Sequence, residues 1–252
     1  MVDELQLYFG DDYVINDFIS LKHPRLNDII SMGENDYFGM INLFTTIPSD
    51  IKPFLYDNFQ IIWEDLSEFE CFLRFFWPQI TSAHSQRLFR GLDFTQFQLE
   101  YNPNTQEYFL YQYKDQNLVV VDSRIYMLIS DALRLMHGQK KKVEHAASKT
   151  VQRILIDDDR AKQKRAAAKR EKEGNKSSIL PLVSALINCS DFKYGLEEIR
   201  QMPIYAFMDS VSRVQIVRNS TALLQGCYSG MIDTKKIDKN ELNFMREIKK
   251  KP

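Results

Sequence analysis

The sequence predicts an α+β protein that is mostly helical, with one small antiparallel sheet in its N-terminal part. Apolar residues recur at helical spacing over much of the chain, for example at i, i+3, i+4 and i+7 of the stretch 35–44: Tyr37, Met40, Ile41 and Phe44. Between residues 94 and 121 the spacing changes to a period of two, with clusters of turn residues between the runs. This change predicts a short β-meander set among helices.

The charges divide the chain into three parts. Its 252 residues carry 33 Lys and Arg against 34 Asp and Glu, so that the net charge is −1. Residues 1–138 hold 9 basic and 20 acidic residues, residues 139–176 hold 13 and 6, and residues 177–252 hold 11 and 8. The sequence therefore predicts an acidic α+β domain, a basic helical linker and a C-terminal helical domain. The net charge argues neither for nor against a polyanionic partner, because it hides this segregation.

Composition limits the class of protein. A hydrophobic fraction of 44% is ample for a buried core. The cysteines Cys71, Cys189 and Cys227 are far apart and form no C-x-x-C pair, which argues against a disulfide framework or a zinc site. The acidic N-terminus does not resemble a secretory signal, and no run of roughly 18 apolar residues occurs. We therefore expect a soluble intracellular protein without a membrane partner.

The first part of the acidic domain is expected to contain short strands and three helices. Apolar positions between residues 5 and 15 indicate short extended pieces. A helix over 25–32 ends at a glycine, and a second helix covers 35–44. Ser49 is expected to cap a third, short helix that runs to Tyr56.

A capping box of the S-x-x-E type predicts the next helix. It comprises Ser67 and Glu70, the helix behind it covers 68–76, and Pro78 ends it. The aromatic residues of this stretch could form a base-stacking platform or a hydrophobic core: Phe69, Phe72, Phe75, Phe76 and Trp77. A core is favoured, because stacking platforms for nucleic acid need basic neighbours and this region is acidic.

The rest of the acidic domain is expected to be the meander and a helix. Three apolar runs within residues 94–121, separated by two turn clusters, predict three antiparallel strands. Asp122 or Ser123 then caps a helix over 124–137, which Gly138 ends.

The linker is expected to be mainly helical. Apolar residues between 143 and 154 follow helical spacing, although residues 154–156 also fit a short strand. The carboxylates of residues 157–159 could bind a metal ion, but adjacent side chains point in different directions. They fit better as the acidic first turn of a polar helix over 160–173, which would be about 21 Å long.

Three functions compete for this linker: a solvated bridge, a contact for an acidic protein surface, and a phosphate contact for nucleic acid. The candidate partner-binding residues are Arg160, Lys164, Arg165, Lys169 and Arg170. Nucleic-acid binding is the less favoured alternative, because the linker has no aromatic residue and no glycine-rich phosphate loop. A helical bridge next to the acidic domain is therefore expected.

Four helices with short connections are expected in the C-terminal domain, which predicts a small bundle. A buried helix has Pro181 in its first turn, and a short amphipathic helix covers 196–202. A long helix begins at Pro203 and ends before Gly226, and part of its face is expected to dock a partner or the first domain. A D-x-x-E cap predicts the last helix over 238–248.

The sequence contains no recognisable catalytic motif. Neither a phosphate-binding glycine motif nor the H-E-x-x-H or G-x-S-x-G pattern occurs. The four histidines are isolated: His23, His84, His137 and His145. His84 lies near Ser82 and Ser85, but this proximity alone does not make a catalytic triad. We expect a protein that is not an enzyme and that has no catalytic residues, no metal and no cofactor.

The C-terminal part resembles a known family. The segments PIYAFMDSV, LLQGCYSG and MIDTKKIDKNELNFMREIKKK follow one another here, with an I-D-x-x-K-I pattern at 232–237. This order resembles that of tail assembly chaperones from siphophages of Gram-positive hosts, in particular the Gp15-like group. The meander and the basic linker have no counterpart in that pattern.

The resemblance implies a non-enzymatic chaperone in the host cell cytoplasm. Such a chaperone keeps the tape-measure or tail-tube protein soluble until virion assembly, and the resemblance assigns no binding residues. The alternatives are a minor structural protein of the virion, in the tail or connector, and a nucleic-acid-binding accessory protein that uses the basic linker.

Overall fold

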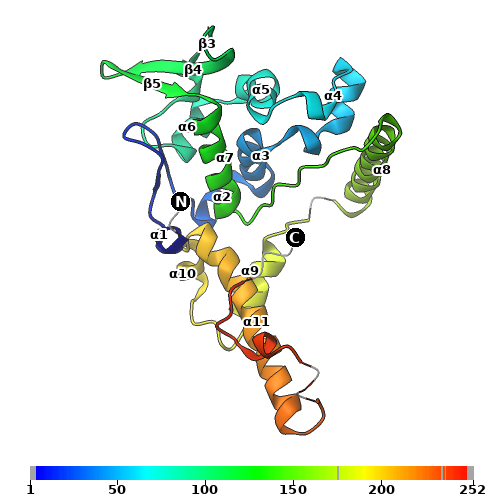
Figure 1. Cartoon of the computed structure of the whole chain (residues 1–252). Helices are drawn as coiled ribbons and strands as arrows, with labels where there is room; N and C mark the ends of the chain where they lie inside the picture. The colour runs from blue at the N-terminus through cyan, green and yellow to red at the C-terminus, as the bar shows by residue number, and fades with distance from the viewer. Residues whose placement is uncertain (1–3, 175, 234, 236, 249–252) are drawn as a thin grey trace.

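The three-stranded sheet lies at the outer edge of the N-terminal half, with helices below it, and helices also make up the C-terminal part (Figure 1). The computed structural model describes residues 4–174, 176–233, 235 and 237–248. Within these residues there are a two-stranded and a three-stranded antiparallel sheet, both in the N-terminal half. The predicted α+β class is therefore confirmed. Among the described residues, no helix is both long enough and apolar enough to cross a membrane.

The chain begins with a helix where extended structure was expected. The first elements are α1 (Glu4–Phe9), β1 (Tyr13–Val14), β2 (Ser20–Leu21), α2 (Leu26–Met32) and α3 (Glu34–Thr45). The prediction of extended structure at residues 5–9 is wrong, because these residues form α1, which contacts α11 and buries only Leu7. Helices α2 and α3 confirm the two helices expected next, and Gly33 between them has a φ of 89°.

The region around Ser49 differs from the prediction. A 3₁₀ turn, Pro48–Asp50, precedes α4 (Lys52–Phe59), and Ile51 occupies the N-cap position. The Asp50 carboxylate accepts a hydrogen bond from the main-chain N–H of Ile47 instead, and this bond closes the 3₁₀ turn. Ser49 is therefore not the helix cap.

The aromatic stretch lies in the core, as expected. Helix α5 (Glu68–Cys71) has the predicted capping box and continues into a π-helical turn, Phe72–Phe76. Phe69 and Phe72 are buried, and Phe72 stacks on Tyr126 with ring centroids 4.5 Å apart. The following elements are a 3₁₀ turn (Trp77–Gln79), α6 (Ser82–Leu88) and a further 3₁₀ turn (Phe94–Gln96).

The predicted meander is present. Strands β3 (Gln98–Asn102), β4 (Glu107–Lys114) and β5 (Asn117–Val121) form it in sequence order. Leu110 lies opposite both Leu99 and Val121; Leu110 and Val121 are buried in the core, whereas Leu99 on the outer strand β3 is exposed. Helix α7 (Ser123–Met136) follows, and its cap is Asp122, which accepts a hydrogen bond from the N–H of Ile125 at 2.8 Å.

The basic linker consists of an irregular strap and one long helix. Residues 139–148, named the strap here, have no helix or strand, so the helix expected from residue 143 is wrong there. Helix α8 (Lys149–Glu173) begins at the Ser148 cap, and residues 154–156 are helical rather than a strand. Residues 157–159 consequently lie in the middle of α8, not in the first turn of a helix.

The C-terminal part contains fewer α-helices than expected. Its described elements are α9 (Leu180–Ile187), α10 (Leu196–Arg200), α11 (Ile204–Tyr228) and a 3₁₀ turn (Lys239–Leu242). The last helix expected over 238–248 is wrong. After the 3₁₀ turn the described residues 243–248 are irregular, and the carbonyls of Phe244 and Arg246 accept hydrogen bonds from the guanidinium of Arg213 on α11.

Two further details of this part differ from the prediction. Helix α9 buries Leu186 while Leu180 is exposed, so it is only partly the buried helix that was expected. Gly226 lies inside α11 and does not end it. A Cβ at Gly226 would lie 2.4 Å from the Cδ1 of Ile232, so the glycine is needed for the close approach of the returning chain.

One hydrophobic core joins both ends of the chain. It includes Tyr37, Phe44 and Leu133 of the N-terminal half together with Ile204 and Phe207 of α11. A smaller cluster consists of Leu55, Trp63, Leu66, Cys71 and Ile156, the last of which belongs to α8. The domain boundaries at residues 138 and 176 stay a prediction.

Candidate interaction site on the basic linker

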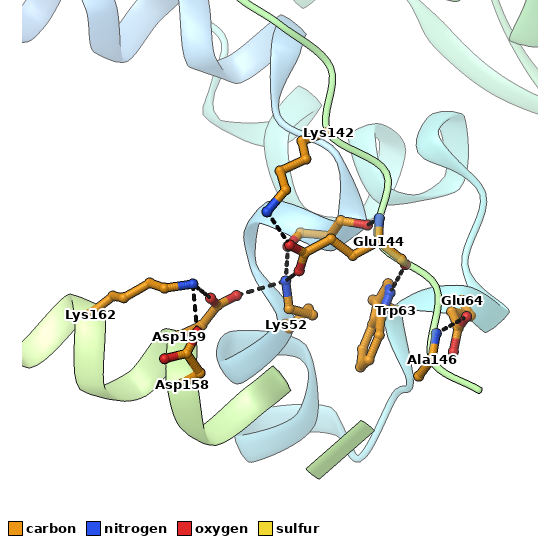
Figure 2. A network of polar contacts seen from close by, with 10 residues as sticks. Lys52, Trp63, Glu64, Lys142, Glu144, Ala146, Asp158, Asp159 and Lys162 are labelled. Atoms are coloured by element: carbon orange, nitrogen blue, oxygen red, sulfur yellow. Dashed lines mark hydrogen bonds and ion pairs between the residues drawn. The ribbon is translucent and has the colours of Figure 1, made fainter. Parts of the chain in front are cut away.

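A buried lysine fixes the linker to the N-terminal half. The Lys52 side chain is only 2% exposed, and its ammonium contacts three oxygens. These are the carbonyl of Ser49 at 2.7 Å, Oε2 of Glu144 at 2.6 Å and Oδ2 of Asp159 at 2.7 Å. Figure 2 shows Lys52 between the two carboxylates, which come from the strap and from α8. An ammonium has three donors, so this arrangement uses all of them.

The strap is held at several further points. The main-chain carbonyl of Glu144 accepts a hydrogen bond from the indole N–H of Trp63 at 2.8 Å. The main-chain N–H of Glu144 donates to the hydroxyl of Ser49. The N–H of Ala146 donates to a carboxylate oxygen of Glu64 at 3.0 Å. The strap has no secondary structure of its own, so these side chains satisfy main-chain groups that would otherwise need water.

The network keeps its members charged. Hydrogen bonds from Lys142 and Lys52 lower the pKa of Glu144 to about 2. Burial alone would raise the pKa of Asp159, but hydrogen bonds from Lys52 and Lys162 outweigh this and lower it. Burial alone would likewise lower the pKa of Lys52, and its bonds to Asp159 and Glu144 raise it instead. Alternating charges therefore hold α8 against α4.

Arg160 is the one candidate partner-binding residue that lies in this docked region. Its guanidinium pairs with Asp57 of α4 and with Asp157 of α8. Arg160 therefore contacts an acidic surface of its own chain, which agrees with the bridge predicted from the sequence.

The other four candidate residues lie on the part of α8 that extends beyond the dock. Residues 161–173 are named the distal half of α8 here. Lys164, Arg165, Lys169 and Arg170 are exposed there, and they form no ion pair with the residues that the structure describes. From Lys162 to Lys172 every described side chain is exposed. The structure thus separates a docked cation from a group of solvent-facing cations.

The three aspartates of the linker are engaged with cations of the protein. Asp157 pairs with Arg160, Asp158 with Lys162, and Asp159 with Lys52 and Lys162. In the described part of the chain, no group of three or more His, Cys, Asp or Glu residues could hold a metal ion. The metal alternative therefore has no support from their geometry.

Ser82 and His84 are not brought together as a catalytic pair. The Ser82 hydroxyl donates to a carboxylate oxygen of Asp93 at 2.6 Å. The Nδ1 atom of His84 instead accepts a hydrogen bond from the N–H of Thr81, at the start of α6. The contact between Thr81 and His84 is part of the cap of α6, and the contact between Ser82 and Asp93 ties the start of this helix to the following 3₁₀ turn.

Sequence reasoning missed Lys52, Trp63 and Glu144. They come from separate parts of the chain, and no motif or spacing connects them. The one local signal is that Lys52 is among the few basic residues of an acidic region. This position indicates that Lys52 forms an ion pair, but it does not identify the acidic partner.

A second surface lies at the C-terminal end of the molecule. The distal part of α11 and the chain that returns along it, residues 215–248, are named the C-terminal arm here and extend away from the rest of the protein (Figure 1). Within its described residues only Ser220 is buried, and its hydroxyl donates to the carbonyl of Glu241 at 2.9 Å. Large apolar side chains are exposed there: Tyr228 (87%), Met231 (87%), Phe244 (51%) and Met245 (74%).

Comparison with known proteins gives a family match over part of the chain. A family model described as the second domain of YomV, from a phage-associated Bacillus family, matches residues 169–249. The match begins in the distal half of α8 and includes α9, α10, α11 and the C-terminal arm. No curated protein and no solved structure matches the chain. The match covers less than half of the chain. Within the matched residues, the similarity indicates a phage-associated protein.

Proposed function

We propose that this protein is a non-enzymatic phage assembly protein that binds a protein partner through its C-terminal arm, in the cytoplasm of the host cell. The observation that carries the proposal is the exposed apolar surface of the arm, within the stretch that matches a phage-associated domain. A projecting arm without a buried apolar residue among its described positions gains stability when a partner covers it.

The chemistry of the arm fits a helical partner. Met231 and Met245 are flexible and polarizable, and such side chains adapt to different apolar faces. An amphipathic helix binds a surface of this kind through residues spaced at i, i+3, i+4 and i+7. We propose that the partner is the tape-measure or tail-tube protein of the phage, and that the protein acts as a tail assembly chaperone.

Co-expression tests this function. The protein would be co-expressed with the tape-measure and tail-tube proteins of the same phage, and each complex purified at physiological salt. We expect one of them to co-purify, and we expect Met231→Ser with Met245→Ser to reduce the recovered partner at least about tenfold, because central apolar contacts carry most of the binding energy.

A matched control separates this surface from exposed apolar residues in general. Val14→Ser with Ile154→Ser removes two apolar side chains that are similarly exposed but lie outside the arm, and it should leave the yield unchanged. Failure of both phage proteins to co-purify would contradict the proposal. Mass spectrometry of purified virions distinguishes a chaperone, which should be absent from them, from a minor structural protein.

A further inference from the structure

The distal half of α8 presents cations in every direction around the helix. At about 100° per residue, Lys164 and Arg170 point about 120° apart. A third direction, about the same angle from each, is occupied by three more cations: Arg165, Lys169 and Lys172. All five side chains are exposed. Residues 161–173 hold six cations against two carboxylates, Glu171 and Glu173, and Glu171 lies on the same side as Lys164. Cations therefore outnumber acids and point in three directions around the helix rather than along one stripe.

The docked half of α8 shows how this helix meets a protein surface. It uses one side, with Ile156 buried against Leu55 and Trp63 and with Asp159 and Arg160 paired at the edge. Protein interfaces commonly have such an apolar centre. After Ile156 the helix has no apolar residue larger than alanine. A flat acidic protein surface would leave the cations on the far side unused.

We propose that the distal half of α8 inserts into the major groove of duplex DNA and binds its phosphates. Phosphates flank a groove on both sides, so a helix with cations on all sides can use most of them. The major groove is about 12 Å wide and accepts a helix about 10–12 Å in diameter. Residues 166–168 are alanines, which keep the helix narrow at its centre, between the cations.

The binding should be independent of DNA sequence. Phosphate contacts position a protein without reading bases, and base reading requires side chains that match base edges. Apart from its cations and from Glu171 and Glu173, the distal half carries only Gln163 as a long polar side chain. The cations are assigned to the phosphates, so no matched set of side chains is left to read the bases. Duplex RNA should bind more weakly, because its major groove is too narrow for side chains to enter.

Fluorescence anisotropy with the full-length protein and a labelled duplex of about 20 base pairs tests the proposal at several salt concentrations. Four substitutions are combined in one variant: Lys164→Gln, Arg165→Gln, Lys169→Gln and Arg170→Gln. Glutamine has nearly the same helix propensity as lysine or arginine, and circular dichroism checks that α8 is intact. Loss of four phosphate contacts should weaken binding at 0.1 M salt about 100-fold or more, and should reduce the slope of log K against log salt by about 3.6.

A control variant carries the same change in net charge. It replaces four exposed cations outside both the linker and the C-terminal arm with glutamine: Arg74, Arg87, Arg124 and Lys193. We expect its affinity to stay within about threefold of the unchanged protein. No binding by the unchanged protein at 50 mM salt, an equal loss in both variants, or equal affinity for duplex RNA would overturn the proposal.

A protein partner for the same cations is a separate outcome. If the distal variant bound DNA as the unchanged protein does but lost the phage protein that co-purifies with it, the distal half would be a protein contact and the proposal would be overturned. The proposed function rests on the C-terminal arm and on different substitutions, so either proposal can fail without the other.

Discussion

At the scale of single residues, Lys52 is a cation buried inside the fold, with its side chain only 2% exposed. A buried ammonium is costly unless its partners remain in place, because the charge cannot return to water. Here two carboxylates and one carbonyl surround it, and its ammonium also lies 5.6 Å from the centre of the Trp63 ring. The position therefore couples α4, the strap and α8.

Replacing Lys52 should loosen the linker. We expect Lys52→Met to lower the free energy of unfolding by about 3 kcal/mol, because it leaves Glu144 and Asp159 without their buried partner. The triple variant Lys52→Met, Glu144→Gln, Asp159→Asn should recover much of this loss, since no uncompensated charge remains. Urea denaturation measures both. A triple variant that is less stable than the single one would show that the carboxylates do not act through Lys52.

Two buried histidines give the fold a dependence on pH. The hydroxyl of Tyr37 lies 2.8 Å from Nε2 of His137, whose Nδ1 lies 2.7 Å from the carbonyl of Leu133. The pKa of His137 is lowered to about 4, mainly by burial; the hydrogen bond with the carbonyl of Leu133 opposes this, and repulsion from His23, when both rings are protonated, adds to it. Burial also lowers the pKa of His23 to about 4; the carboxylate of Asp12 opposes this and Arg25 adds to it. Both imidazoles are therefore neutral in the folded protein at pH 7.

Stability should decrease on acidification. The unfolded chain binds these protons near pH 6.5, whereas the folded chain binds them only near pH 4, so the stabilisation is complete above pH 6.5 and is lost as the pH falls toward 4. Urea midpoints measured between pH 7 and 4.5 should fall less steeply in His137→Gln than in the unchanged protein. Identical slopes would mean that His137 is not the group that titrates.

At the scale of elements, the sequence predicted what short-range chemistry determines. The capping residues Ser67 and Asp122 start the expected helices, and Pro203 stands at the N-cap position of α11. The change of period at residues 94–121 located the meander, because alternation fixes which side chains face the core. These signals lie within a few residues of the structure they determine.

The elements that were predicted wrongly depend on distant parts of the chain. Helix α1 packs against α11, and the irregular segment 243–248 is bound through two main-chain carbonyls by Arg213 of the same helix. Gly226 resembles a helix stop in the sequence, yet it accommodates Ile232 from the returning chain. Contacts between residues so far apart in the sequence cannot be predicted from the pattern of neighbouring residues.

The candidate site was predictable in its composition but not in its geometry. The sequence located the cations of the linker, including Arg160 and Lys164. It did not reveal that Arg160 is docked on Asp57 while the later cations face solvent. The position of the dock depends on Lys52 and Ile156, which meet only in the folded chain.

At the scale of the whole molecule, charge and packing divide the chain differently. The charges change sign at residue 139, but the main hydrophobic core does not stop there. Phe207 of α11 is fully buried in the same core as Phe44 and Leu133, and the main-chain N–H of Ile204 donates to the carbonyl of Pro24 at 2.9 Å. The C-terminal helices are therefore joined to the N-terminal half by packing as well as by the linker.

This shared core predicts a single unfolding transition. Phe207→Ala should lower the free energy of unfolding by about 3–5 kcal/mol and lower the melting temperature by about 10 °C, since the cavity opens in a core that both ends of the chain contribute to. Calorimetry should record one transition that moves as a whole. Leu196→Ala, at an exposed position on α10, serves as the control and should move it little. Two transitions, of which Phe207→Ala moves only one, would mean that residues 1–138 and 177–252 unfold as independent domains.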